Sequence, residues 1–190
     1  MPPGTDLRGK VFVFPAESEM AHVALKDRPK KPLTSFTWCI RTFTDLTRPH
    51  ALLSYATKEH DNTIFFFKPS PSKYQFDMGE ESVTFSTGGK QMVKPVREHT
   101  CVSWDSATGL VAFWLDMEPF PRKGLRKGYS VPATASIVLG QDQDSYGRGF
   151  DATQSFVGEM EDVCMADWVL SRSEVIAASV FLTCLLAGHH

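Results

Sequence analysis

Residues 36–43 read Phe36-Thr-Trp-Cys-Ile-Arg-Thr-Phe43, and their alternating character decides the fold class. Successive side chains of an extended chain point to opposite faces, so Phe36, Trp38 and Ile40 share one face. The residues between them, which include Cys39, share the other face. Period-two alternation that is rich in aromatic and β-branched residues predicts a β-strand that packs on at least one face.

Runs of the same character recur at short intervals on both sides of this stretch. They cover residues 10–14, 51–56, 63–68, 74–78, 82–86, 99–104, 110–115, 135–140 and 156–163. The segment Asp105-Ser-Ala-Thr-Gly109 joins two of them as a hairpin turn. Many short strands separated by turn signals, with almost no helical period, predict an all-β antiparallel sandwich.

One helix is expected near the C-terminal end of the sequence. Ser171-Arg-Ser-Glu174 has the pattern of a capping box, with Ser171 at the N-cap and Glu174 three residues later. The apolar run that follows, residues 175–187, spans roughly 20 Å as a helix, whereas the hydrocarbon core of a bilayer is roughly 30 Å thick. We therefore expect a packed helix and no transmembrane span.

Composition limits the function classes. The 190 residues suit one domain, and a formal net charge of −2 gives no electrostatic reason to expect nucleic acid or anionic lipid as a partner. Four cysteines are enough for one structural disulfide. The first residues, Met-Pro-Pro-Gly-Thr-Asp, contain no apolar segment of the kind that marks a signal peptide.

The stretch from Gly140 to Gln154 gathers oxygen ligands in a glycine-bent loop. Its acidic residues are Asp142, Asp144 and Asp151, and its amides are Gln141, Gln143 and Gln154. Ca²⁺ favours such sets, because it accepts six to eight oxygens at variable geometry. The loop is no EF-hand, since Tyr146 and Thr153 stand where that motif needs acidic ligands. A solvated acidic surface loop is the alternative.

The segment His99-Thr-Cys-Val-Ser-Trp-Asp-Ser106 matches the pentraxin signature His-x-Cys-x-Ser/Thr-Trp-x-Ser at every defined position. Further segments that resemble the short pentraxins are 9–15, 36–39, 54–58, 61–62, 128–129, 139–146 and 155–158. The resemblance covers residues 5–180 as a pentraxin domain and leaves 181–190 as a divergent apolar tail. It implies a jelly-roll (concanavalin-like) form of the sandwich.

The resemblance also implies how the cysteines are used. In this family Cys39 and Cys101 would form the intrachain disulfide, which contributes on the order of 4 kcal/mol in the chain-entropy model. Cys164 and Cys184 are not at family disulfide positions. We expect them to be buried or free, and Cys184 could couple two chains.

By resemblance, the acidic loop is half of a site for two adjacent Ca²⁺ ions, and a second loop supplies the rest. The implied ligands are Asp61, Asn62, Asp142, Gln143 (through its main-chain oxygen), Asp144, Asp151 and Gln154. Asp142 stands where the serum members have glutamate, so its carboxylate is one methylene shorter. In the family such ions are not catalysts; they hold phosphate or carboxylate oxygens of a ligand.

The family's pocket beside the ions maps to Phe67, Asp77 and Ser82. Phe67 stands where an aromatic residue packs against ligand methyl groups. Asp77 replaces a Thr or Tyr, and Ser82 replaces the glutamate that meets the choline ammonium. Phosphocholine is therefore in question as a ligand, and phosphoethanolamine or acidic saccharides remain open.

The resemblance predicts a secreted, non-enzymatic, lectin-like protein of innate immunity, of the acute-phase type. It would recognise phosphate- or carboxylate-bearing ligands on cell debris or microbial surfaces as a cyclic homo-oligomer, a pentamer. Complement or Fc receptors are further partners implied. Asp116 keeps an acidic residue of the family's effector groove, whereas Glu118 and Ser179 depart from it.

Two alternatives stay open. Glu159 and Glu161 share one face of a predicted strand, roughly 7 Å apart along it, as in a jelly-roll glycoside hydrolase. A solvated strand face explains the same pair without chemistry. The other alternative is a truncated pentraxin, whose altered end after residue 180 would expose sheet edge and impair ligand binding and assembly.

Overall fold

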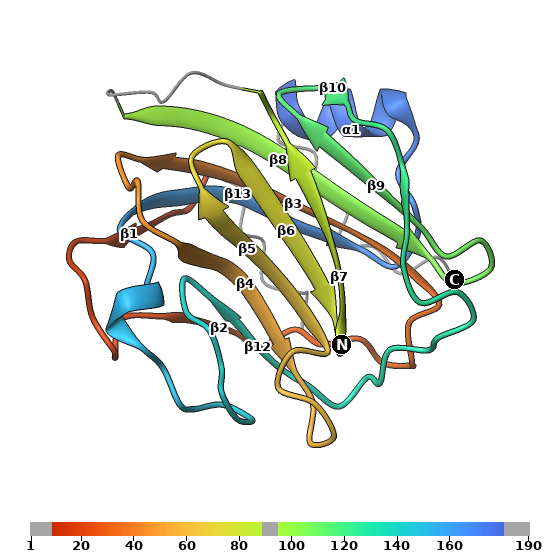
Figure 1. Ribbon diagram of the computed structural model, residues 1–190, viewed down its shortest axis with the longest axis horizontal. Helices are drawn as coiled ribbons and strands as arrows, with labels where there is room; N and C mark the ends of the chain where they lie inside the picture. The colour runs from red at the N-terminus through yellow and green to blue at the C-terminus, as the bar shows by residue number, and fades with distance from the viewer. Residues whose placement is uncertain (1–8, 89–94, 181–190) are drawn as a thin grey trace.

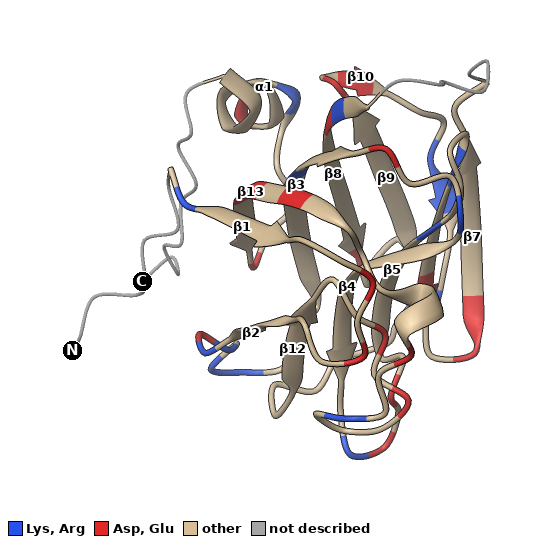
Figure 2. Cartoon of the chain, turned by 90° about the vertical axis from the view of Figure 1, so that its left-hand side faces the viewer, with Lys and Arg blue, Asp and Glu red and all other residues tan. Residues whose placement is uncertain are grey.

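The computed structural model describes residues 9–88 and 95–180, which form two antiparallel β-sheets packed face to face (Figure 1). The seven-stranded sheet runs in the order β1 (Val11–Phe14), β13 (Gly158–Ala166), β3 (Ser35–Thr44), β8 (Val96–Asp105), β9 (Leu110–Leu115) and β10 (Glu118–Pro119), and β11 (Lys123–Gly124) also pairs with β9. The six-stranded sheet runs in the order β2 (Val23–Leu25), β12 (Ser136–Leu139), β4 (His50–Ala56), β5 (Ile64–Ser70), β6 (Lys73–Met78) and β7 (Glu81–Ser86). The view in Figure 2, turned by 90°, shows the two layers. The predicted jelly-roll sandwich is confirmed.

The strand β3 sits inside its sheet and has the two faces that its sequence predicts. Phe36, Trp38 and Ile40 lie in the main core between the sheets. Trp104 of β8 packs beside Phe36, with ring centroids 5.7 Å apart, and its indole N–H donates to the Leu125 carbonyl at 2.9 Å. The aromatic residues of the alternating strands thus build the layer that joins the two sheets.

The helix α1 (Arg172–Val180) begins at the predicted capping box. The Ser171 amide donates to the Glu174 carboxylate at 2.7 Å, and the Glu174 amide donates to the Ser171 hydroxyl at 3.3 Å. Val175 and Ala178 of this helix pack on the outer face of the seven-stranded sheet, in a second apolar cluster that contains Cys39. Among the described residues, no helix is long and apolar enough to cross a membrane.

All three cysteines of the second cluster are in disulfide bonds. Cys39 and Cys101 face each other across β3 and β8 and form a disulfide with a Cα–Cα distance of 4.1 Å, as the family resemblance implies. Cys164 is buried beside them, as expected, but it also takes part in a disulfide, so the expectation of a free thiol is wrong for this residue. The remaining expectation, for Cys184, lies outside the described residues, as does the predicted apolar tail 181–190.

A buried ion pair joins the two sheets, and the sequence did not predict it. Lys68 of β5 donates to the Glu98 carboxylate of β8 at 2.7 Å, and the hydroxyl of Tyr74 on β6 donates to the same carboxylate. The Lys68 ammonium also lies 4.7 Å from the centre of the Tyr74 ring. Burial and then the Glu98 charge raise the pKa of Tyr74 well above its usual value, so the phenol stays a hydrogen-bond donor.

Candidate calcium and ligand site

The acidic loop begins at Gly140, and a hydrogen bond ties the far end of the loop back to the same residue. The residue has φ +78°, and a side chain there would collide with the ring of Phe14. Its amide donates to the Leu52 carbonyl at 3.1 Å, and its carbonyl accepts from the Phe156 amide at 2.9 Å. Glycine therefore fixes the point where the loop starts, next to strand β4.

Gln143 anchors the middle of the loop with its side chain. The side chain is fully buried, and its amide group donates to the carbonyls of Ser54 at 3.1 Å and Ser136 at 3.0 Å. Its side-chain oxygen accepts from the Gly147 amide at 2.9 Å. Because the side chain is committed to the loop's own structure, a role for Gln143 as an ion ligand falls to its main-chain oxygen.

The second predicted half of the site is the loop between β4 and β5. The hydroxyls of Thr57 and Thr63 meet at 2.8 Å across its base, and the Gly79 amide donates to the Asn62 carbonyl at 2.7 Å. The Asp61 carboxylate accepts from the Asn62 amide at 2.9 Å. The side-chain oxygen of Asn62 is buried and has no hydrogen-bond partner among the described residues.

The two loops bring acidic groups toward Asp142. Burial, followed by the charges of Asp144, Asp61 and Asp77, raises the pKa of Asp142 to about 6. One carboxylate oxygen of Asp142 is buried without a hydrogen-bond partner in the described part of the chain. Buried, unsatisfied oxygens that repel one another fit a divalent cation, which would satisfy and neutralise them.

The acidic groups are nevertheless not a closed cage in this structure. Within residues 9–88 and 95–180, no three carboxylates offer oxygens that all lie within 4.8 Å of one another. Binding of an ion would therefore draw the loops together. Without the ion, the carboxylates around Asp142 repel one another, and no cation compensates this repulsion.

This repulsion predicts a pH effect on the metal-free protein. The folded-state pKa of Asp142, about 6, lies above the ordinary value of 3.8, so the folded chain holds this proton more tightly than the unfolded chain. Stability from this group is therefore present at low pH and is lost as pH rises through about 6. Between about pH 5 and pH 7.5 the loss is about 1 kcal/mol. Urea unfolding in EDTA checks this, with Asp142→Asn as the variant in which the loss should vanish; an equal pH dependence in both chains would contradict it.

The far end of the acidic loop contains the short helix η1 (Ala152–Gln154), which Asp151 precedes and Gln154 ends. Asp151 is the N-cap of η1, and its carboxylate accepts from the amide of Thr153 at 2.9 Å and from its hydroxyl at 2.8 Å. These hydrogen bonds lower the pKa of Asp151. The structure thus gathers Asp144, Asp61 and Asp77 around Asp142, while the Asp151 carboxylate is engaged in its own turn.

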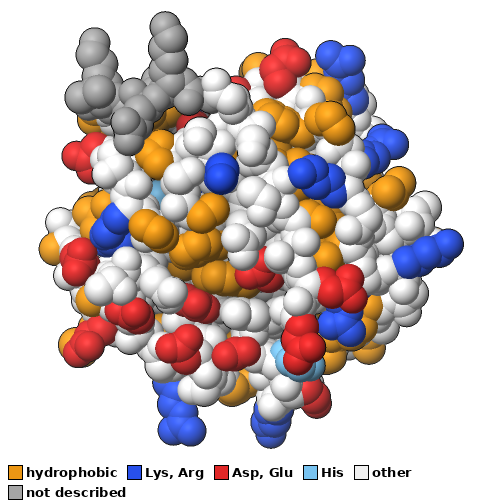
Figure 3. All heavy atoms as spheres, in the orientation of Figure 1, with side chains coloured by type: hydrophobic (Ala, Val, Ile, Leu, Met, Phe, Trp, Pro, Cys, Tyr) orange, Lys and Arg blue, Asp and Glu red, His pale blue; other side chains and the backbone are white. Residues whose placement is uncertain are grey.

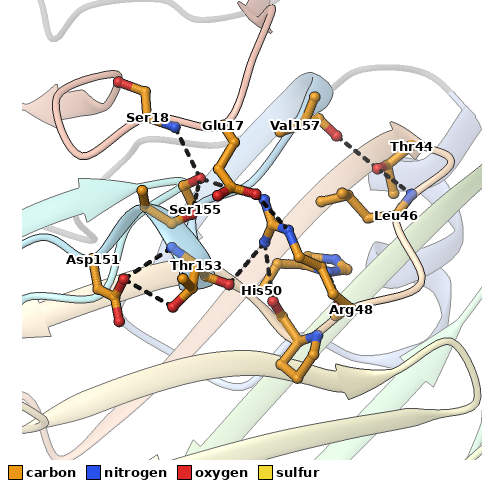
Figure 4. Close-up of polar contacts among 12 residues, drawn as sticks. Glu17, Ser18, Thr44, Leu46, Arg48, His50, Asp151, Thr153, Ser155 and Val157 are labelled. Atoms are coloured by element: carbon orange, nitrogen blue, oxygen red, sulfur yellow. Dashed lines mark hydrogen bonds and ion pairs between the residues drawn. The ribbon is translucent and has the colours of Figure 1, made fainter.

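Arg48 holds this end of the loop, a role that the sequence did not reveal. Its guanidinium donates to the Thr153 carbonyl at 3.1 Å and lies 3.3 Å from the Glu17 carboxylate (Figure 4). The Ser155 hydroxyl accepts from the Ser18 amide at 3.3 Å in the same network. Because Thr153 lies 105 residues after Arg48, no local pattern connects the two.

The predicted ligand residues lie on the outer face of the six-stranded sheet. Phe67 stacks beside Phe65, with ring centroids 5.3 Å apart, and Asp77 pairs in register with Ser82. Burial raises the pKa of Asp77, although a hydrogen bond from Gln75 at 2.9 Å opposes the shift. On the face shown in Figure 3, acidic side chains border an area of hydrophobic side chains.

The two acidic residues considered for hydrolase chemistry lie on β13, in the other sheet. Glu159 and Glu161 stand opposite Phe43 and Arg41 of β3. The Glu161 carboxylate is paired with the guanidinium of Arg97. This ion pair supports the alternative in which the two glutamates lie on a solvated strand face and take part in no chemistry.

Comparison with known proteins gives one consistent result. The model of the Pentaxin family matches residues 10–187. The chain is 49% identical to mucosal pentraxin of Bos taurus over 166 residues, covering 87% of this chain and 75% of that protein. It is 49% identical to serum amyloid P-component of Sus scrofa over 170 residues, covering 90% and 75%. Among solved structures, the native heptameric SAP-like pentraxin from Limulus polyphemus superimposes with a TM-score of 0.82 at 21% identity, covering 92% of this chain and 83% of that one.

Proposed function

Since the chain belongs to the pentaxin family, we propose that it is a calcium-dependent, lectin-like recognition protein that binds phosphorylated or acidic ligands. As a member of that family, the chain is proposed to recognise ligands and not to catalyse a reaction. Two Ca²⁺ ions per chain would be held by Asp61, Asn62, Asp142, Asp144 and the main-chain oxygen of Gln143, with Asp151 and Gln154 joining from η1. When bound, the ions supply positive charge and open coordination positions for anionic oxygens of a ligand.

The observation that carries this proposal is the environment of Asp142. Its unsatisfied buried oxygen and the charges of Asp61, Asp144 and Asp77 leave the metal-free loops destabilised. A solvated acidic surface loop would place its carboxylates in water, and Asp142 is only 7% exposed. The burial of Asp142 therefore favours a metal site over a solvated acidic surface loop.

The pocket residues favour a ligand that carries both a phosphate and a primary ammonium. The ions would take the phosphate, whereas the Asp77 carboxylate beside them attracts a cation. A primary ammonium can donate hydrogen bonds to Asp77 and to the Ser82 hydroxyl opposite it, and a quaternary ammonium has no N–H to donate. We thus expect phosphoethanolamine to bind better than phosphocholine, and acidic saccharides are the second ligand class.

Assembly and location follow the same proposal. Weak single sites gain avidity when a cyclic homo-oligomer presents them together, and we propose a pentamer. The disulfides of Cys39, Cys101 and Cys164 suit an oxidising, extracellular location. Recognition of debris or microbial surfaces, and engagement of complement or Fc receptors, would follow from such an assembly.

Chromatography on immobilised phosphoethanolamine tests the function. The chain is expected to be retained in Ca²⁺ and released by EDTA, with weaker retention on a phosphocholine matrix. Retention that persists in EDTA would contradict the mechanism. A chain that aggregates and is not retained in Ca²⁺ would favour a pentraxin with impaired ligand binding and assembly.

A further inference from the structure

Three cysteines and one histidine meet under helix α1, on the side of the sandwich that carries no part of the calcium site. Cys164, Cys39 and Cys101 stand opposite one another in register on β13, β3 and β8. His99 precedes Cys101 by two residues on β8, so it shares the outer face of the sheet. One ligand atom from each of Cys39, His99 and Cys101 lies within 4.8 Å of the other two.

His99 has an unused ring nitrogen inside this cluster. The residue is only 1% exposed, and its Nε2 has no hydrogen-bond partner among the described residues. Its backbone is fixed on both sides by Asp116, whose carboxylate accepts from the His99 amide and whose amide donates to the His99 carbonyl, both at 2.8 Å. Burial and then the Arg41 charge lower the pKa of His99 to about 4.

We propose that the reduced chain binds one Zn²⁺ ion through the thiolates of Cys39 and Cys101 and the imidazole of His99, and that formation of the disulfide expels this ion. The proposal concerns a site separate from the calcium loops and stands independently of their function.

The ligand set selects a metal of this kind. Thiolate and imidazole are the usual ligands of Zn²⁺, whereas Ca²⁺ takes oxygen. Two thiolates and a neutral imidazole balance the charge of the dication, so the complex adds no net charge to a buried position. The second cluster encloses it, because Val175, Ala178, Leu170 and Trp114 pack around the two cysteines.

The disulfide and the metal exclude each other. In a tetrahedral zinc site with Zn–S distances of about 2.3 Å, two sulfur atoms lie about 3.8 Å apart, which covalently joined sulfurs cannot do. Reduction by a dithiol or phosphine adds two electrons and two protons to the disulfide, and zinc binding then releases those two protons. A disulfide oxidant such as oxidised glutathione takes two electrons from the zinc-bound thiolates and two protons from solvent. The Cys39–Cys101 bond forms, two thiols of the oxidant are produced and Zn²⁺ leaves.

Titration with Co²⁺, a spectroscopic substitute for Zn²⁺, tests the site. The full chain is reduced with a phosphine, and excess Ca²⁺ occupies the acidic loops. We expect a thiolate-to-cobalt charge-transfer band that saturates at one ion per chain and disappears when Zn²⁺ is added. The oxidised chain should show no such band. A band of equal strength in the oxidised chain would overturn the proposal.

Two histidine variants identify the ligand. His99→Asn is expected to lose the saturable one-to-one binding. His50→Gln is the matched control, because His50 is also 1% exposed with an unpartnered Nε2 but lies on β4 of the other sheet. Equal cobalt binding by the His99→Asn chain would place the ion elsewhere and overturn the proposal. If the reduced chain unfolds without metal, Zn²⁺ is expected to restore its β-sheet circular dichroism, and failure to restore it would also overturn the proposal.

Discussion

Asp142→Asn is expected to have two opposite effects: a higher melting temperature for the metal-free protein near neutral pH, and the loss of most of the stabilisation by Ca²⁺. The first effect arises because the substitution removes a buried charge that Asp144, Asp61 and Asp77 repel. The second arises because a carboxylate ligand becomes a neutral amide. Calcium affinity depends strongly on ligand charge, and we expect it to fall by about 100-fold.

Thermal melts with and without Ca²⁺ measure both effects. Glu118→Gln is the control, since it removes one exposed carboxylate on β10, in the other sheet. It should leave both melting temperatures close to those of the parent chain. If Asp142→Asn lowers the melting temperature of the metal-free protein, or keeps the full stabilisation by Ca²⁺, the assignment of Asp142 is wrong.

Glu98→Ala is expected to produce the largest loss of stability of any single substitution considered for this chain, about 3–5 kcal/mol of unfolding free energy. The substitution leaves the Lys68 ammonium buried between the sheets without its counter-charge. It also removes the hydrogen-bond acceptor of the buried Tyr74 hydroxyl. Urea unfolding measures the change.

A second ion pair supplies the matched control for Glu98. Glu161→Ala removes the partner of Arg97, whose side chain is 48% exposed, and pairs of that kind contribute about 0–1 kcal/mol. The double variant Lys68→Met/Glu98→Leu removes both buried charges and should recover much of the loss. Equal effects of Glu98→Ala and Glu161→Ala would show that the inter-sheet pair is not buried in solution.

The sequence predicted those parts of the fold that have a local cause. Alternation in residues 36–43 correctly placed β3 and its two faces, and Ser171 and Glu174 correctly marked the start of α1. The two-residue strands β10 and β11 were missed, because their pairing with β9 carries no alternation of its own.

The candidate site was predictable only in part. The acidic residues of 140–154 indicated a cation from their chemistry alone, but their link to Asp61 and Asn62 came from the family resemblance. Arg48 and the pair of Lys68 with Glu98 were missed, because each contact joins segments that are distant in sequence and becomes visible only when the strands pack. The unpartnered Nε2 of His99 was missed for the same reason, because it arises only when the strand packs under α1.

The central claim is that Ca²⁺ on this face of the sandwich holds the ligand. Calorimetric titration of phosphoethanolamine into the chain, first stripped of metal and then loaded with Ca²⁺, tests it most directly. The account predicts saturable binding by the calcium-loaded chain, after uptake of two ions per chain, and no binding by the metal-free chain. Equal binding of phosphoethanolamine with and without Ca²⁺ would contradict it.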